Sequence, residues 1–107
     1  MNDRLLSFLG LCRRAKKLVI GAEVTVQSIE QGRSLLVLYA SDASKNSLKP
    51  VLRAAKEYGI PVKCALRSKD ELSEALGRLC AVLSVEEKGF AGKLPQMIES
   101  EAERRII

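Results

Sequence analysis

The first third of the chain changes between helix-like and strand-like spacing of apolar residues. After Asp3, which suits a helix N-cap, apolar residues recur at helical intervals, at Leu5, Leu6, Leu9 and Cys12. The next run, KLVIG, is short and ends at Gly21, as a strand does before a turn. From residue 22 to residue 31 the spacing is helical again, and Gly32 suits the end of that helix. This part of the chain is predicted to form a helix, a strand and a helix.

The middle of the chain contains a continuous apolar run, LLVLYA, over residues 35–40. A run without alternation is typical of a central strand that is buried on both faces. The following SDAS supplies N-cap candidates, including Asp42, for a helix that ends near Tyr58. Pro50 lies inside that helix, where it predicts either a kink or a late start.

The last part of the chain repeats the alternation. IPVKCAL predicts a third strand, and SKDELSEALG predicts a helix in which Ser68 and Glu71 form a capping box. LCAVLSV predicts a fourth strand. After it we expect a turn around Gly89 and Gly92, and then a helix that begins after Pro95, a residue that suits a first helical turn.

Regular alternation of helices and strands predicts one α/β domain, residues 1–107, with helices on both faces of a sheet. A hydrophobic content of 47 % in 107 residues is enough for a core of this size. With 2 Phe, 2 Tyr and no Trp, that core must be aliphatic. So few rings also exclude an aromatic platform of the kind that stacks on single-stranded nucleic acid.

The net charge of +5 is concentrated at the start of the chain. Residues 1–20 hold five Lys or Arg against one acid, whereas residues 61–107 hold equal numbers of both signs. Most of the early cations form one cluster, Arg13, Arg14, Lys16 and Lys17. Two explanations are open: the cluster stabilises a helix C-terminus through the helix dipole, or it faces a polyanion such as nucleic acid.

No catalytic, metal or cofactor motif is present. The chain has no histidine, which removes the commonest general base and the common zinc patterns, and it has no glycine-rich phosphate loop. Cys12, Cys64 and Cys80 are widely spaced among apolar residues, so we expect buried free thiols in a reducing compartment, with Cys80 lacking an activating partner. No run is long enough to span a membrane, and the N-terminus is a poor signal peptide. We expect a cytoplasmic protein that is not an enzyme and has no cofactor.

Several segments, in their order and spacing, resemble a known family. They are RRAKKLV before a glycine, LLVLYASDAS, YGIPV, SKDELSEALG and EEKGFAGKL. Together they are similar to the small bacterial YlxQ-like members of the ribosomal L-seven-Ae and L-thirty-e family. This resemblance covers nearly the whole chain. It implies a three-layer α/β/α sandwich with a central four-stranded mixed sheet, and it implies binding of RNA. The typical ligand is a kink-turn, a sharply bent internal loop with tandem sheared G·A pairs.

The resemblance also implies an RNA-reading turn at Gly21, Ala22, Glu23 and Val24, with Gln27 one helical turn later. In typical kink-turn binders this turn reads Gly-x-Asn-Glu, with a lysine three residues after the Glu, and the Asn and Glu contact guanine edges. Here Glu23 stands in place of the Asn, Val24 in place of the Glu and Gln27 in place of the lysine. Valine accepts no hydrogen bond and glutamine carries no charge, so ordinary kink-turn reading is in question.

A second contact implied by the resemblance is the loop before the last strand, with Arg78 and Leu79. In relatives this loop is apolar and packs on a flipped-out nucleotide, so Leu79 is a candidate for that contact or for anchoring the loop, and Arg78 for a phosphate. Related sequences read Arg-Ala-Gly-Lys where this chain has Lys16. If that glycine is left-handed, Lys16 carries some strain and adds a cation.

These patterns favour a non-catalytic protein that binds structured RNA in a ribosome or translation context, with ribosome-associated proteins as further candidate partners. The alternative is a protein-interaction module on the same fold, because Glu23, Val24 and Gln27 depart from the RNA-reading pattern. A small enzyme is the weakest hypothesis, since no carboxylate or thiol site suggests itself.

Overall fold

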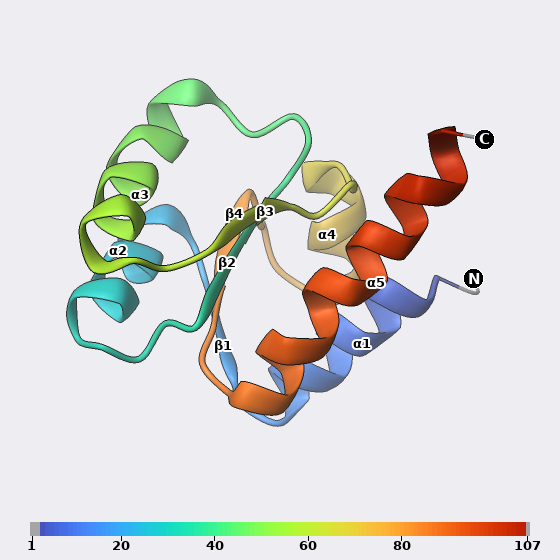
Figure 1. Ribbon diagram of the computed structural model, residues 1–107, viewed down its shortest axis with the longest axis horizontal. Coiled ribbons are helices and arrows are strands. Elements are labelled where there is room, and N and C mark those ends of the chain that lie inside the picture. The colour runs from blue at the N-terminus through green and yellow to red at the C-terminus, as the bar shows by residue number, and fades with distance from the viewer. Residues whose placement is uncertain (1–2, 107) are drawn as a thin grey trace.

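The computed structural model describes residues 3–106, and within them five helices alternate with four strands (Figure 1). The elements are α1 (Arg4–Arg14), β1 (Leu18–Ile20), α2 (Ala22–Glu30), β2 (Leu36–Tyr39), α3 (Lys45–Tyr58), β3 (Val62–Cys64), α4 (Lys69–Leu76), β4 (Val82–Val85) and α5 (Lys88–Ile106). The predicted order of elements is confirmed, although the strands are shorter than the apolar runs that predicted them.

The four strands form one mixed sheet in the order β1-β4-β2-β3. β2 and β3 are parallel, and β4 lies antiparallel between β1 and β2. The first three strands therefore end where β4 begins, at Ile20, Tyr39, Cys64 and Val82. We call this edge of the molecule the exit end of the sheet.

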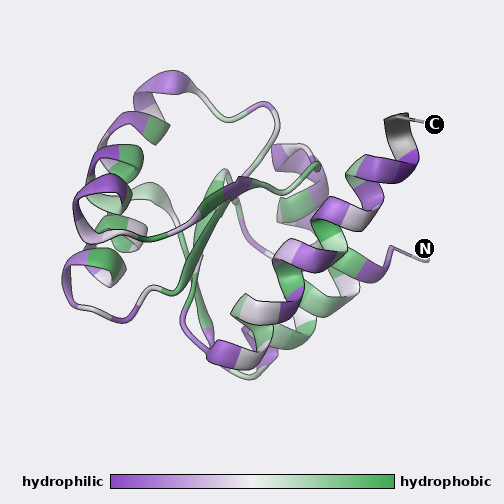
Figure 2. Cartoon of the chain, in the orientation of Figure 1, coloured by the Kyte–Doolittle hydropathy of each residue, from purple (hydrophilic) through white to green (hydrophobic). Residues whose placement is uncertain are grey.

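Helices cover both faces of the sheet, so the three-layer sandwich is confirmed. α2 and α3 lie on one face, and α1, α4 and α5 lie on the other (Figure 1). α2 and α3 each connect parallel strands in the same direction across the sheet, and right-handed crossovers of that kind place both helices on the same face. The helices turn their hydrophobic sides toward the sheet (Figure 2).

The central strand β2 is buried on both faces, as predicted from its continuous apolar run. Leu36 and Leu38 join the core cluster beneath α1, α4 and α5, while Val37 joins the cluster beneath α2 and α3. This division follows from the alternation of side chains along a strand. Apart from Cys12 and Cys80, the buried hydrophobic residues are all aliphatic, as the composition requires.

The helix caps combine local and tertiary contacts. The capping box of Ser68 and Glu71 in α4 is confirmed. α3 is capped by Ser44, begins at Lys45 and continues through Pro50, so the expected late start is wrong. Asp42 does not cap α3: its carboxylate accepts a hydrogen bond from the N–H of Lys69, the first residue of α4, at 2.8 Å.

The prediction of a turn around Gly89 and Gly92 is wrong, because α5 begins at Lys88 and contains both glycines and Pro95. The Glu87 carboxylate accepts hydrogen bonds from the N–H groups of Gly89 at 3.0 Å and Phe90 at 2.9 Å. These bonds satisfy two amides of the first turn and lower the pKa of Glu87. Leu94 and Ile98 of the same helix are buried, and that burial outweighs the poor helix propensity of glycine.

Candidate RNA-binding surface

Two segments of the predicted interface lie side by side at the exit end of the sheet. Gly21 follows β1, and its N–H donates to the carbonyl of Val82, the first residue of β4, at 2.9 Å. The α4–β4 loop, which contains Arg78 and Leu79, leads directly into Val82. Antiparallel pairing of β1 with β4 therefore joins two segments that are far apart in the sequence.

Gly21 precedes α2 with φ 119° and ψ 149°, a conformation that favours glycine. No side chain caps α2, whereas Asp3, Ser44 and Ser68 cap three of the other helices. A Cβ atom placed on Gly21 would have no heavy atom within 4 Å, so the space beside the turn is open. The first amides of α2 are therefore positioned to donate to an external acceptor.

The side chains that follow Gly21 divide between the core and the surface. Ala22 packs against the core cluster beneath α2 and α3, so its backbone is the part available to a ligand. Glu23, Val24 and Gln27 are exposed, and the Val24 side chain is left 40 % exposed. We call residues 21–24, together with Gln27, the open turn. Its exposed side chains are one carboxylate, one apolar group and one amide.

The α4–β4 loop presents Leu79 with 81 % of its surface exposed. The residues on either side of Arg78 and Leu79 are held in place: Gly77 ends α4 in the left-handed conformation at φ 75°, and the N–H of buried Cys80 donates to Ser73 Oγ at 2.9 Å. Leu79 consequently does not anchor the loop in the core. It projects from a fixed loop, where it is accessible to a ligand.

Arg13 links the basic segment to this loop. Its guanidinium donates to the carbonyl of Leu76, the last residue of α4, and lies close to Gly77. Arg14 and Lys16 line the same surface depression as Arg13 and Gly77. The helix C-terminus that Arg13 contacts is that of α4. Arg14 and Lys16 are exposed, and a polyanion facing them stays a prediction.

Lys17 is separated from the Gly21 turn by the length of β1. Its carbonyl accepts from the N–H of Glu86, at the opposite end of the strand from Gly21. Lys16, which has φ 60°, ends α1 just before Lys17. The N–H groups of Lys16 and Lys17 donate to the carbonyls of Arg13 and Cys12, which is a Schellman motif.

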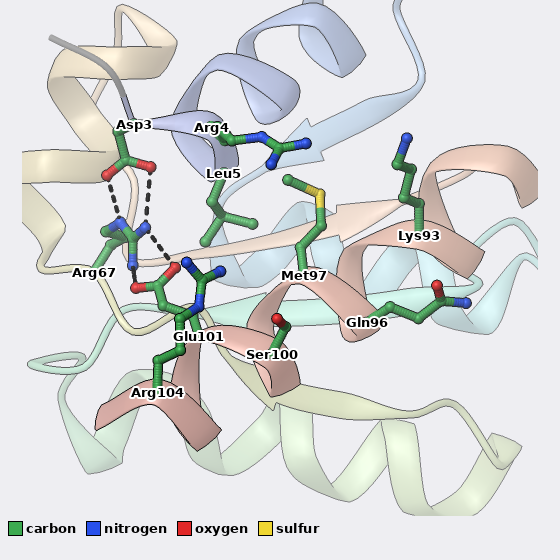
Figure 3. A pocket seen from close by; sticks show the side chains of 10 residues that line it. All are labelled: Asp3, Arg4, Leu5, Arg67, Lys93, Gln96, Met97, Ser100, Glu101 and Arg104. Carbon is green, nitrogen blue, oxygen red and sulfur yellow. Dashed lines mark hydrogen bonds and ion pairs between the residues drawn. The ribbon is translucent and has the colours of Figure 1, made fainter. Parts of the chain in front are cut away.

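A further depression lies between α1 and α5 and is lined by both charges and apolar groups (Figure 3). One of its lining residues is Arg67, which is 7 % exposed and is clamped between Asp3 and Glu101. The guanidinium also donates to the carbonyl of Leu66, at 2.8 Å. These bonds lower the pKa of Asp3 and raise that of Arg67, and they tie the start of α1 and the end of α5 to the segment after β3. This ion-pair network stabilises the fold, and the sequence pattern does not reveal it.

The thiols are poorly suited to nucleophilic chemistry. Cys12 and Cys80 are buried as predicted, while Cys64 is half-buried. Burial raises the pKa of Cys12 to about 12 and that of Cys80 to about 11, so both are thiols at neutral pH. Within residues 3–106 no group of three or more Cys, Asp or Glu side chains is arranged to hold a metal ion. No helix in that range has the length and apolarity to cross a membrane.

Comparison with known proteins identifies the family. Residues 3–94 match the Ribosomal protein L7Ae/L30e/S12e/Gadd45 family. The chain belongs to this family. The RNA-binding protein YlxQ of Enterococcus faecium is 32 % identical over 98 residues, which are 92 % of this chain and 94 % of that protein. The RNA-binding protein YlxQ of Bacillus subtilis (strain 168) is 35 % identical over 92 residues, covering 85 % and 91 % of the two chains.

Solved structures share the fold. A protein of unknown function from Bacillus halodurans C superposes with a TM-score of 0.83 at 35 % identity, over 90 % of this chain and 97 % of that one. The Giardia lamblia 15.5kD RNA binding protein superposes with a TM-score of 0.67 at 22 % identity, over 97 % and 92 %. The second likeness concerns the fold alone. The resemblance seen in the sequence is thus confirmed at the level of family and fold.

Proposed function

We propose that this protein is a non-catalytic RNA-binding protein that holds structured RNA at the exit end of its sheet. The observation that carries the proposal is the Gly21 N–H bond to Val82, which places the uncapped start of α2 beside the exposed Leu79 loop. An open helix N-terminus suits a phosphate, and an exposed apolar side chain suits the face of an unstacked base. The family membership and the names of the YlxQ relatives support the same ligand class.

The proposed contacts fall into three groups around this end. The open turn contributes the backbone of Gly21 and Ala22 and the side chains of Glu23, Val24 and Gln27. The loop contributes Arg78 and Leu79. The third group is the basic cluster Arg13, Arg14, Lys16 and Lys17. Arg14 and Lys16 are free to approach phosphates, Arg13 is shared with α4, and Lys17 lies at the other end of β1 from the turn.

We propose a kink-turn as the specific RNA ligand. The residues that contact its guanines would differ from those of typical kink-turn binders. Glu23 is an exposed acceptor one position earlier than the usual glutamate, and it can accept from a guanine edge, whereas Val24 offers only an apolar contact. The proposed setting is ribosomal or other translation-related RNA in the cytoplasm, with ribosome-associated proteins as further partners.

The decisive experiment titrates the protein with a kink-turn RNA and with the same RNA after replacement of its G·A pairs. Loss of binding on replacement supports recognition of the kink-turn at the Gly21 turn. Equal, weak binding to both RNAs, with a steep salt dependence, would leave only charge attraction and would contradict kink-turn recognition.

A matched pair of leucine variants tests the surface itself. Leu79→Ala is expected to weaken RNA binding about tenfold, because roughly 1.4 kcal/mol of apolar contact is lost when three carbons are only partly covered. Leu35→Ala is the control, since Leu35 is also exposed but precedes β2 at the end of the sheet opposite the exit end, where its N–H donates to the carbonyl of Val85. Equal affinities for both variants and the unaltered protein would exclude the loop from the interface.

The alternative is a protein partner at the same end of the sheet. The exposed apolar groups Val24 and Leu79 favour it, because neither requires a nucleic acid as ligand. Affinity capture from an RNase-treated lysate separates the two ideas. Partners that survive RNase and are lost with Leu79→Ala favour the protein-interaction module, and partners that disappear with RNase favour RNA.

A further inference from the structure

α3 carries a row of four cations on its outward face. Their spacing of four, four and three residues places them on one side of the helix, at Lys45, Lys49, Arg53 and Lys56. All four are exposed. The buried residues of the same helix are Val51, Ala54 and Ala55, so the row points away from the core. The outer side of α3 is correspondingly hydrophilic in Figure 2.

These cations have no anionic partners in the part of the chain that the structure describes. Other cations do: Lys63 pairs with Glu99 at 2.8 Å, Arg33 approaches Glu86, and Arg67 is held on two sides. Within the row, neighbours three and four residues apart repel one another. One acid, Glu57, lies on this helix. Acidic side chains within the row would stabilise the helix more than four cations do. The uniform positive charge of the row therefore indicates an external anion.

The row starts near the proposed RNA-binding surface. β2 ends at the exit end, and α3 begins there after the short segment Ala40–Ser44. α3 also packs beside α2, and Ile29, Val51 and Ala54 belong to the same buried cluster. The open turn lies at the start of α2. From Lys45 to Lys56 the row extends away from the exit end for about 16 Å.

We propose that this row binds the phosphate backbone of an RNA arm that continues from the exit end along α3. The inference rests on the proposed RNA-binding function and adds a second contact region to it. Cations on flexible side chains, without aromatic neighbours in the row, contact phosphates and do not read bases. The row therefore contributes to the affinity for RNA and to the direction in which the arm lies. The exposed acid Glu30, at the end of α2, repels phosphates, which keeps the arm on the α3 side.

The test compares two variants with the same loss of charge. The α3 variant is K45Q/K49Q/R53Q/K56Q. The control variant is R4Q/K88Q/K93Q/R104Q, which removes four exposed cations from α1 and α5 on the other face of the sheet. Both variants replace outward-facing side chains, and a thermal melt by circular dichroism checks that they are folded.

Each protein is titrated with a short-armed and a long-armed version of one kink-turn RNA at several salt concentrations. The longer arm spans the row of about 16 Å. On the long-armed RNA the α3 variant is expected to reduce the slope of log Kd against log salt by about 0.7–0.9 for each lost phosphate contact, roughly 3 in all. On the short-armed RNA its slope is expected to match that of the unaltered protein.

Equal slopes for the α3 variant and the control variant on the long-armed RNA would overturn the inference, because only net charge would then matter. If the unaltered protein had the same salt slope on the short-armed and the long-armed RNA, the inference would be overturned as well. Neither result affects the proposed function. If the unaltered protein binds no RNA at all, the proposed function fails first and this inference falls with it.

Discussion

Arg67 is the residue whose replacement we expect to cost the most stability for a single charged side chain. Its guanidinium makes two bonds to Asp3, at 2.8 and 3.0 Å, two to Glu101, at 2.6 and 2.9 Å, and one to the Leu66 carbonyl. Arg67→Met keeps the buried aliphatic stem but removes the guanidinium that lies between the two carboxylates. Removing one partner of a buried ionic group typically costs about 3–5 kcal/mol.

The structure places the expected loss near the lower end of that range. The side chains of Asp3 and Glu101 are 20 % and 26 % exposed, so water can reach them once Arg67 is gone. We expect a loss of about 3 kcal/mol, a large part of the 5–15 kcal/mol that is usual for a domain, and a fall in Tm of roughly 12 °C or more. Urea unfolding followed by far-ultraviolet circular dichroism at neutral pH measures it.

The loss should also depend on pH with a defined sign. The folded-state pKa of Asp3 is lowered below its ordinary value of 3.8, chiefly by its hydrogen bonds to Arg67. A group with a lowered folded pKa contributes stability above its unfolded pKa and loses it as the pH falls through the folded value. The difference between the unaltered protein and Arg67→Met should hold at neutral pH and shrink below about pH 4.

The control is Lys63→Gln, which removes the ion pair with Glu99. That pair is as short as the Arg67–Asp3 pair, at 2.8 Å, but its side chains are 34 % and 61 % exposed. We expect it to cost less than about 1 kcal/mol. If both variants lost the same stability, burial would not control the strength of these ion pairs, and the reasoning would be refuted.

Two further predictions concern single positions whose conformation or bonding is unfavourable. Lys16→Gly should raise the free energy of unfolding by about 0.5–1 kcal/mol. Glycine relieves the backbone strain at φ 60°, and this gain exceeds the extra chain entropy that glycine loses on folding. Lys16→Ala keeps the strain and should show no such gain in urea unfolding. Thr25→Val should stabilise by about 1 kcal/mol, since Thr25 Oγ1 is the buried side-chain polar atom without a hydrogen-bond partner in the described residues. Ser84→Ala serves as the comparison and should destabilise the protein by about 1–3 kcal/mol, because the Ser84 hydroxyl bonds to Ser28 and Ser34. If Thr25→Val lowered the free energy of unfolding by a similar amount, the threonine hydroxyl would have to be hydrogen-bonded.

The features that the sequence determined are those governed by neighbours in the chain. The capping box of Ser68 and Glu71 spans three residues, and the helix stop at Gly77 depends on one left-handed residue. Burial of residues 36–38 followed from their unbroken apolar run. For Lys16 the resemblance raised the left-handed conformation only as a condition, and the structure shows it at φ 60°. Local geometry and hydrophobic spacing suffice for such features.

Features that join distant segments were decided by the tertiary structure. α5 contains Gly89, Gly92 and Pro95, residues that locally disfavour a helix, yet Glu87 caps it and the core buries Leu94. Asp42 caps a helix other than the next one in the chain. Pairing of β1 with β4 brings the Gly21 turn to the Leu79 loop and leaves Lys17 at the opposite end of the strand. A sequence pattern records which residues are apolar or charged, but the strand order decides which of them meet, because contacts between distant segments depend on how the whole chain packs.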